Sequence, residues 1–224
     1  MSSSCSYVAD LSGLSRIRER GVQIVVVPRK LPESLFVAEE DIASTGTFEG
    51  HANVPIEGGG AAPAWRRTGE RRQLFPEIDG LPFAAALRRD AYELSRHFAG
   101  LAGLSSVHVG LEILDQDACR KWHVDRVGMR LLVTYAGPGT EWALESDVDR
   151  GWLGEASLDL DEANDRIVFD RAAIRRASVG DVLLCKGDVF EGKPGQGLVH
   201  RSPPVRADCR WRLLLRIDER GCGG

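Results

Sequence analysis

The chain has 224 residues, of which 43% are hydrophobic and 28% are charged. This composition is that of an ordinary globular protein and excludes a disordered one, and the length suits one domain spanning residues 1–224. The formal net charge of −4 gives no general attraction to nucleic acid or to an anionic membrane. We therefore expect neither of them as a partner.

The N-terminal segment and the cysteines bear on the cellular compartment. Residues 1–10 are polar, and no apolar run reaches the roughly 18 residues of a membrane helix, so we expect a cytoplasmic protein without a secretory signal. The five cysteines are scattered and form no Cys-x-x-Cys pair, which argues against a disulfide framework and a zinc ribbon. The sequence leaves the oligomeric state open, with a homodimer as one alternative.

The first half of the chain predicts a strand, a long loop and a helix. Residues 22–27 are mostly β-branched and predict a buried strand. Residues 44–76 are rich in Gly, Ala, Pro and Arg and show no periodicity, so we expect a flexible loop or lid inserted into the domain. Apolar residues then recur at steps of three and four from Phe83 to Leu101, which predicts one amphipathic helix.

Short apolar segments in the second half predict strands. They are rich in Val, Leu and Ile and are separated by turns of Gly, Pro and Asp. Their ranges are 106–114, 128–135, 166–169, 181–185 and 210–217. One helix beside many antiparallel strands predicts a mainly β fold with flanking helices, which we interpret as a cupin-like jelly roll, or double-stranded β-helix.

The segment 121–125, K-W-H-V-D, carries the strongest chemical signal. Residues two apart in a strand point to the same side, so His123 and Asp125 would face one cavity. His200 follows 75 residues after Asp125. Two imidazoles and one carboxylate can hold Fe(II) on one face and leave the other positions open for O2 and a co-substrate. We therefore predict a metal site made of these three residues.

The last predicted strand supplies candidates for binding a carboxylate. Alternation places Arg210 and Arg212 on one face of residues 210–217 and apolar side chains on the other. A guanidinium pairs with a carboxylate through two parallel hydrogen bonds. We expect Arg210 to bind the far carboxylate of a 2-oxo acid, with Arg212 as the next candidate and Arg130 as the third.

Other aromatic and basic residues near these motifs are candidates for the cavity. The candidates for substrate binding are Trp122, Arg126, Trp142 and Arg212. The candidates for catalysis are Arg210, Arg212 and Tyr135. For the two aromatic residues Tyr135 and Trp142, a place in the hydrophobic core is the alternative.

A zinc site is an alternative to an iron site. Cys119 stands four residues before His123, and a thiolate suits Zn(II) better than an iron that activates oxygen. A further ligand would come from Cys185, Cys209 or His200. A closed site of this kind would make the chain a zinc-binding protein of metal homeostasis.

Three strings of residues carry a resemblance to a known family. They are K-W-H-V-D at 121–125, T-Y-A-G-P-G-T-E-W at 134–142 and G-L-V-H-R-S-P at 197–203. They closely resemble a bacterial family called domain of unknown function 1826, over about residues 20–218 apart from the insertion. This resemblance implies a family without an established activity.

The spacing of the metal-site residues also resembles that of the Fe(II)/2-oxoglutarate dioxygenases. That resemblance implies His123, Asp125 and His200 as iron ligands, Arg210 as the anchor of 2-oxoglutarate, and Fe(II), 2-oxoglutarate and O2 as cofactors. Arg212 replaces a small hydroxyl residue of that pattern, so 2-oxoglutarate itself is left open. We expect an oxygenase that oxidises a small anionic or amino-acid-like molecule; the alternative is a cupin-like metalloenzyme that does not use 2-oxoglutarate.

Overall fold

The computed structural model describes residues 4–56, 74–114, 119–192, 194–203 and 211–219. The α-helices are α1 (Glu39–Thr45), α3 (Ala84–Ala102) and α4 (Leu160–Ile167). The strands are β1 (Cys5–Tyr7), β2 (Ile24–Val27), β3 (Phe48–Pro55), β4 (Ser106–Leu114), β5 (Met129–Ala136), β6 (Glu141–Trp142), β7 (Arg175–Arg176), β8 (Val182–Lys186), β9 (His200–Arg201) and β10 (Arg212–Asp218). Short 3-10 helices lie between several of these elements.

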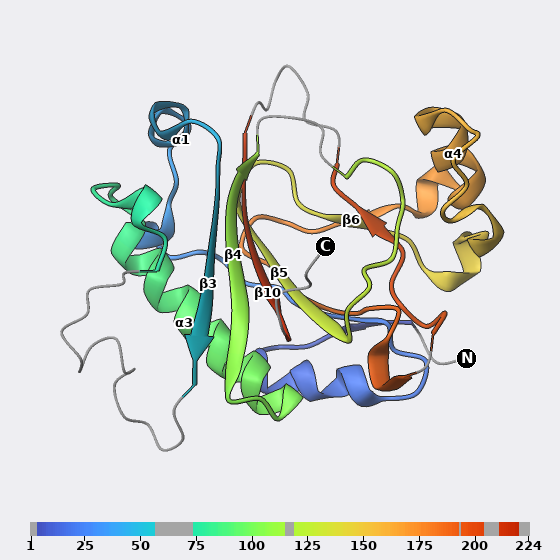
Figure 1. The fold of residues 1–224 in the computed structure, drawn as a ribbon, viewed down its shortest axis with the longest axis horizontal. Helices are drawn as coiled ribbons and strands as arrows, with labels where there is room; N and C mark the ends of the chain where they lie inside the picture. Colours follow the sequence, from blue (N-terminus) through green and yellow to red (C-terminus); the bar gives the residue numbers. More distant parts are fainter. Residues whose placement is uncertain (1–3, 57–73, 115–118, 193, 204–210, 220–224) are drawn as a thin grey trace.

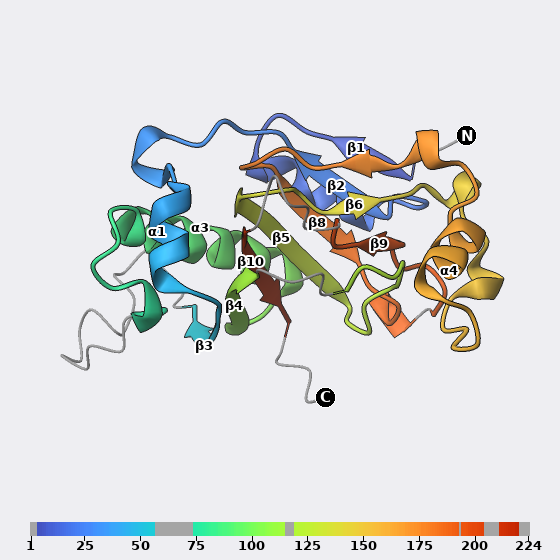
Figure 2. The same ribbon diagram turned by 90° about the horizontal axis from the view of Figure 1, so that it is seen from above.

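The strands form two sheets that lie on top of each other. The larger sheet has the order β1-β2-β8-β5-β10-β4-β3, and the smaller one has the order β7-β6-β9. Strands β1 and β2 pair in parallel, whereas the other neighbours pair antiparallel. Helix α3 covers one face of the larger sheet (Figure 1). The smaller sheet and α4 lie on its other face (Figure 2).

Alternation along the central strands assigns their side chains to two different layers. In β10, Leu213, Leu215 and Ile217 are fully buried in the cluster that also contains the apolar residues of α3. Leu214 instead packs in a second cluster, together with Trp142 of the smaller sheet. The polar residues of β10 that share the side of Leu214 therefore lie between the two sheets, where a cavity can hold them.

The predicted amphipathic helix is confirmed as α3. Its buried positions follow steps of three and four residues, as the apolar stripe of the sequence requires. Gly103 ends the helix with a φ of 70°, a left-handed conformation that glycine adopts at little cost. The mainly β composition of the chain, with helices on the outside, is confirmed as well.

The predicted loop at 44–76 is wrong for its first part. Residues Phe48–Pro55 form β3, which pairs along its whole length with β4. This edge strand buries only Gly50 and Val54, and it contains Asn53 and Pro55, so it lacks the apolar alternation by which a strand is recognised. Residues 57–73 lie outside the described part of the chain.

The strand predicted at 166–169 is also wrong. Residues Leu160–Ile167 form α4, whose first turn is capped by a hydrogen bond of 2.8 Å from the Glu162 backbone N–H to the Asp159 side chain. Val168 contributes only an isolated bridge to Val148. The apolar run was too short for periodicity to separate the end of a helix from a strand.

In the described part of the chain, no helix combines the length and apolarity needed to span a bilayer.

Candidate metal centre and its cavity

The structure brings His123, Asp125 and His200 together. Each offers one ligand atom, and these atoms all lie within 4.8 Å of one another. His123 and His200 face each other across an antiparallel bridge with two backbone hydrogen bonds of 3.0 Å. Asp125 Oδ2 lies 3.1 Å from His200 Nε2, and Asp125 Oδ1 lies 3.8 Å from His123 Nε2. The three predicted ligands are therefore close enough to share one cation.

The backbone fixes the orientation of both imidazoles. His123 Nδ1 is 2.8 Å from the carbonyl oxygen of Lys121, and His200 Nδ1 is 3.1 Å from that of Leu198. Because a carbonyl oxygen only accepts, each Nδ1 must carry the proton and donate it. Both Nε2 atoms are directed toward Asp125. In the neutral form of each imidazole the lone pair is then on Nε2, which is the tautomer that a metal ion requires.

Arg130 forms an ion pair with the carboxylate of Asp125. Its Nη1 is 2.6 Å from Asp125 Oδ1, and its Nε is 2.7 Å from Asp218 Oδ1. Burial alone would raise the pKa of Asp125, but the nearby His200, Arg130 and His123 lower it well below its usual range. Asp125 therefore stays ionised, the form in which a carboxylate binds a metal.

A divalent cation fits the donor set of the site. Asp125 Oδ2 is buried and has no hydrogen-bond partner among the described residues, because His200 Nε2 is near but poorly aligned. A buried carboxylate oxygen of this kind is costly unless a cation satisfies it. Two imidazole nitrogens and one carboxylate are the ligands with which non-haem Fe(II) is held.

Arg212 lies in the same cavity and has hydroxyl partners in place of carboxylates. The side chain is 2% exposed. Its guanidinium donates to the hydroxyls of Thr140 at 2.6 Å, Ser202 at 2.9 Å and Thr134 at 3.3 Å, while its Nε has no partner among the described residues. Burial lowers the pKa of Arg212 to about 10. A buried cation without a paired anion is poised to bind one.

The two histidines of the triad and Arg212 line the same cavity of about 90 Å³. Arg130 and Thr140 line it as well. The cavity lies between the two sheets because β9 belongs to the smaller sheet and β5 and β10 belong to the larger one. It therefore joins a candidate metal site to a candidate anion site.

Of the three predicted arginines, one is not described by the structure and another is already paired with carboxylates. Arg210 lies outside the described residues, so its predicted role as an anchor stays a prediction. Arg130 already binds Asp125 and Asp218, and a guanidinium engaged with two carboxylates has little left for a co-substrate. Arg212, the second candidate, is the arginine that the fold places in the cavity.

The structure does not bring Tyr135 to the cavity, which corrects its predicted catalytic role. Tyr135 points to the opposite face of β5, into the core beneath α3. There its hydroxyl donates to Asp90 of the helix. Burial raises the pKa of Tyr135 well above its ordinary value, so the residue is a neutral core aromatic, the alternative that the sequence had left open.

Trp142 and Arg126 do not line the cavity of the triad. Trp142 is 1% exposed and packs in the cluster of Leu214, and Arg126 is exposed at the surface. Trp122 is also 1% exposed and packs in a separate cluster, but with His123 it lines a neighbouring cavity of about 650 Å³. Its predicted role in substrate binding therefore stays a prediction.

The zinc alternative finds no fourth ligand among the described residues. Cys119 is exposed and does not belong to the group of three ligand atoms. Cys185 is a buried free thiol of the second apolar cluster, and burial raises its pKa well above the ordinary value. Cys209 lies outside the described residues.

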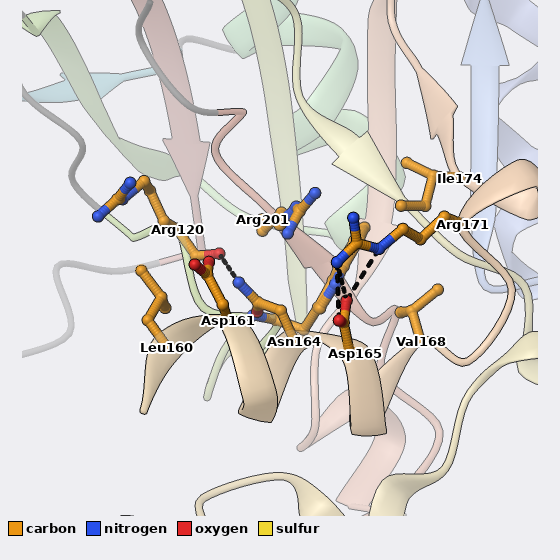
Figure 3. A pocket seen from close by; sticks show the side chains of 10 residues that line it. Arg120, Leu160, Asp161, Asn164, Asp165, Val168, Arg171, Ile174 and Arg201 are labelled. Atoms are coloured by element: carbon orange, nitrogen blue, oxygen red, sulfur yellow. Dashed lines mark hydrogen bonds and ion pairs between the residues drawn. The ribbon is translucent and has the colours of Figure 1, made fainter. Parts of the chain in front are cut away.

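Another cavity, of about 220 Å³, is lined by Trp122 and by residues of α4, and none of the triad residues line it. Its charged side chains are already engaged, for example Arg171 with Asp165 at 2.6 Å (Figure 3). Asn164 of α4 accepts a hydrogen bond from the Trp122 backbone N–H at 3.0 Å and donates to the Arg120 carbonyl oxygen at 3.2 Å. This wall therefore positions the segment that carries His123 and is the less suitable binding site.

Several residues of the site were missed by the sequence analysis. The hydroxyls of Thr134, Thr140 and Ser202 orient Arg212, and Asn164 holds the segment before His123. Thr134 and Thr140 stand in the unusual string at 134–142, which was the available signal. Ser202 likewise stands in the string at 197–203. Asn164 had no such signal, because only the tertiary structure brings it to its partners.

The sequence comparisons place the chain in a family. Residues 9–218 match the family described as protein of unknown function, DUF1826. The chain belongs to this family. The resemblance stated from the three strings is therefore confirmed. No curated protein matches the sequence.

Solved structures with similar folds cover most of the chain at low identity. A BsmA homolog from Methylobium petroleophilum is 13% identical with a TM-score of 0.46, covering 97% of this chain and 96% of that one. A Pseudomonas putida prolyl-4-hydroxylase is 12% identical with a TM-score of 0.40, covering 93% and 97%. A full-length Neurospora crassa protein in complex with alpha-KG is 11% identical with a TM-score of 0.42, covering 93% and 75%. All three TM-scores are below 0.5, so no role is transferred from these proteins.

Proposed function

We propose that this protein is a non-haem oxygenase that depends on Fe(II) and 2-oxoglutarate and oxidises a small molecule. The observation that carries the proposal is the position of Arg212. A buried guanidinium without a carboxylate partner shares a cavity of about 90 Å³ with two imidazoles and one carboxylate. A dicarboxylate that chelates a metal at one end and pairs with arginine at the other satisfies both sites.

The arrangement of the two sheets supports the same proposal. We infer that they form a double-stranded β-helix, with the triad at the edge of the smaller sheet and Arg212 on the larger one. In such a fold the space between the sheets holds small ligands. The layer between the sheets here contains the cavity together with an apolar cluster around Trp142 and Leu214.

The residues of the chain have separate tasks in this reaction. When bound, iron and the oxo acid would supply, together with O2, an oxidant strong enough to attack a C–H bond of the substrate. His123, Asp125 and His200 would hold the metal, and Arg130 keeps Asp125 ionised and in place. Arg212 would bind the far carboxylate of the oxo acid, oriented by the hydroxyls of its three neighbours. The enclosing sheets limit the access of water.

An anaerobic titration tests the proposal. The iron-loaded protein should develop a weak metal-to-ligand charge-transfer band in the visible when 2-oxoglutarate is added. Arg212→Gln should keep its iron affinity and lose about 2–5 kcal/mol of 2-oxoglutarate binding, because it removes one partner of a buried charge pair.

Arg210→Gln is the matched comparison for that titration. If this variant loses the band and Arg212→Gln keeps it, the anchor is Arg210, as the sequence first indicated. If the band never forms in fully iron-loaded protein, the proposal fails. A metalloenzyme that does not use 2-oxoglutarate is then the remaining interpretation of the triad.

A further inference from the structure

The cavity contains a second pair of charges that the proposed function does not use. Glu112 of β4 and Arg216 of β10 both line it, together with Arg212. Glu112 lies opposite Leu214 in the strand register, and Arg216 lies opposite Gly110.

These two charges attract each other but are not hydrogen-bonded. Glu112 Oε1 and Arg216 Nη2 are 3.3 Å apart. Glu112 is 8% exposed, yet its Oε1 has no hydrogen-bond partner among the described residues. Arg216 Nε likewise has none, although Asp218 Oδ2 lies 3.4 Å away. A buried acceptor and a buried donor are therefore unsatisfied side by side, which is costly unless a ligand completes them.

The other ion pairs around the cavity leave Glu112 and Arg216 as the pair that a further ligand can reach. Arg130 is paired with Asp125 and Asp218, and Arg201 shares Glu141 with Arg176. Glu112 and Arg216 offer one negative and one positive group, so a ligand that pairs with both should carry one charge of each sign.

We propose that Glu112 and Arg216 bind the α-ammonium and α-carboxylate groups of a zwitterionic, amino-acid-like substrate. The ammonium group donates to Glu112 Oε1, and the carboxylate accepts from Arg216. A simple anion would leave Glu112 unpaired, and a simple cation would leave Arg216 unpaired. The oxidation of this ligand rests on the proposed function, whereas its binding does not. The inference narrows the anionic or amino-acid-like substrate expected from the sequence.

Binding of free amino acids to the full chain tests this inference. The protein is loaded with Mn(II), and each of the common free L-amino acids is titrated by calorimetry at neutral pH. Glu112→Gln keeps the volume of the side chain and removes its charge, so the affinity for the tightest binder should fall about tenfold or more. The Nα-acetyl and methyl ester derivatives of that amino acid should bind the unaltered protein similarly weakly.

Two further variants serve as controls. Glu49→Gln alters a glutamate on β3 that lies directly opposite Glu112 in the strand register and whose side chain is 61% exposed; its affinity should match that of the unaltered protein. The double variant Glu112→Gln with Arg216→Gln removes both charges, so neither residue is left as a buried charge without its partner. It should keep the fold, as judged by circular dichroism, and still lose the binding.

Three outcomes would overturn the inference. They are the absence of binding by any free amino acid, equal affinities of the Glu112→Gln and Glu49→Gln variants, and equal binding of the acetylated and free forms. Failure of the proposed function looks different. In that case the visible band with Fe(II) and 2-oxoglutarate is missing, while the calorimetric binding of amino acids still depends on Glu112.

Discussion

Arg130 and Arg212 lie on neighbouring strands and are both largely buried, but their surroundings give them different tasks. Burial opposes the charge of Arg130, yet Asp218 and Asp125 outweigh it and raise its pKa above the ordinary value. Among the described residues the hydrogen-bond partners of Arg212 are all hydroxyls, and burial lowers its pKa to about 10. The first arginine therefore supports a metal ligand, and the second is open to an external anion.

The supporting role of Arg130 can be measured with Arg130→Gln. Loss of the donor to Asp125 should weaken the binding of Mn(II) or Fe(II) by about 10–100-fold, as is typical when the partner of a metal ligand is removed. The free energy of unfolding should fall by about 3–5 kcal/mol, because buried Asp218 loses its partner. Metal titration and urea denaturation give the two quantities.

The double variant Arg130→Gln with Asp218→Asn separates these effects. It removes the unpaired charge at position 218, so most of the stability should return. Metal affinity should stay low, since Asp125 still lacks its donor. Recovery of both quantities together would mean that Arg130 acts through the fold alone.

At the scale of the elements, Gly137 fits the turn between β5 and β6 against the start of β10. Its φ is 79°, and a Cβ there would lie 2.0 Å from the carbonyl oxygen of Trp211. Gly137→Ala should therefore add a close contact to the cost of a left-handed alanine. Gly154 has a φ of 81° with nothing within 4 Å of its Cβ position, so Gly154→Ala has the backbone cost alone, about 1–2 kcal/mol.

The two alanine variants should thus differ in their free energies of unfolding. We expect Gly137→Ala to be less stable than Gly154→Ala by a further 1–3 kcal/mol or so, the usual cost of overpacking. Urea denaturation of both variants measures the difference. Equal losses of unfolding free energy in the two variants would show that the start of β10 can shift without cost. Its contact with the turn would then contribute nothing to stability.

The elements that the sequence predicted well are those with a complete pattern of their own. Helix α3 has a long apolar stripe, and β4 was predicted with the bounds Ser106–Leu114 that the structure has. Strand β3 is held by its pairing with β4 and has little apolar pattern. The end of α4 carries a short apolar run that fits a strand equally well. Pairing acts between segments and was out of reach of a pattern along one segment. The cap of α4 is different, because Asp159 and Glu162 are three residues apart and give a local signal that was missed.

The difference between local patterns and contacts between segments also explains how much of the site could be predicted. His123 and Asp125 could be predicted because their spacing of two is local, although the structure has an isolated bridge at His123 in place of the expected strand. His200 followed from the three-ligand pattern. Alternation put Arg210 and Arg212 on one face and could not show which of them enters the cavity. That depends on Thr134, Thr140 and Ser202, which come from two other parts of the chain.

For the whole molecule, the metal site links segments that are distant in sequence. His123 and Asp125 stand about 75 residues before His200, and their ligand atoms meet only in the folded state. Because an ion that binds the folded state alone stabilises it, Mn(II) at about 100 times its Kd should add about 2.7 kcal/mol to the free energy of unfolding.

Variants at two histidines show whether the stabilisation by Mn(II) depends on the triad. His200→Ala should abolish the gain in stability, whereas His97→Ala, which alters an exposed histidine of α3, should keep it. Denaturation with and without Mn(II) gives the comparison. An equal gain in the two variants would place the ion somewhere other than the triad.

Strand β10 is the last described strand in the chain, but it lies in the middle of the larger sheet, between β5 and β4. During synthesis on the ribosome, β4 and β5 must therefore wait with unpaired edges until residues 212–218 have emerged. His123, Asp125 and His200 are made before that moment, and Arg212 and Arg216 arrive with the strand itself. A growing chain consequently contains the three residues of the triad before it contains Arg212 and Arg216. Because β10 joins β5 to β4, the side chains that line the cavity come together only when this last strand has paired.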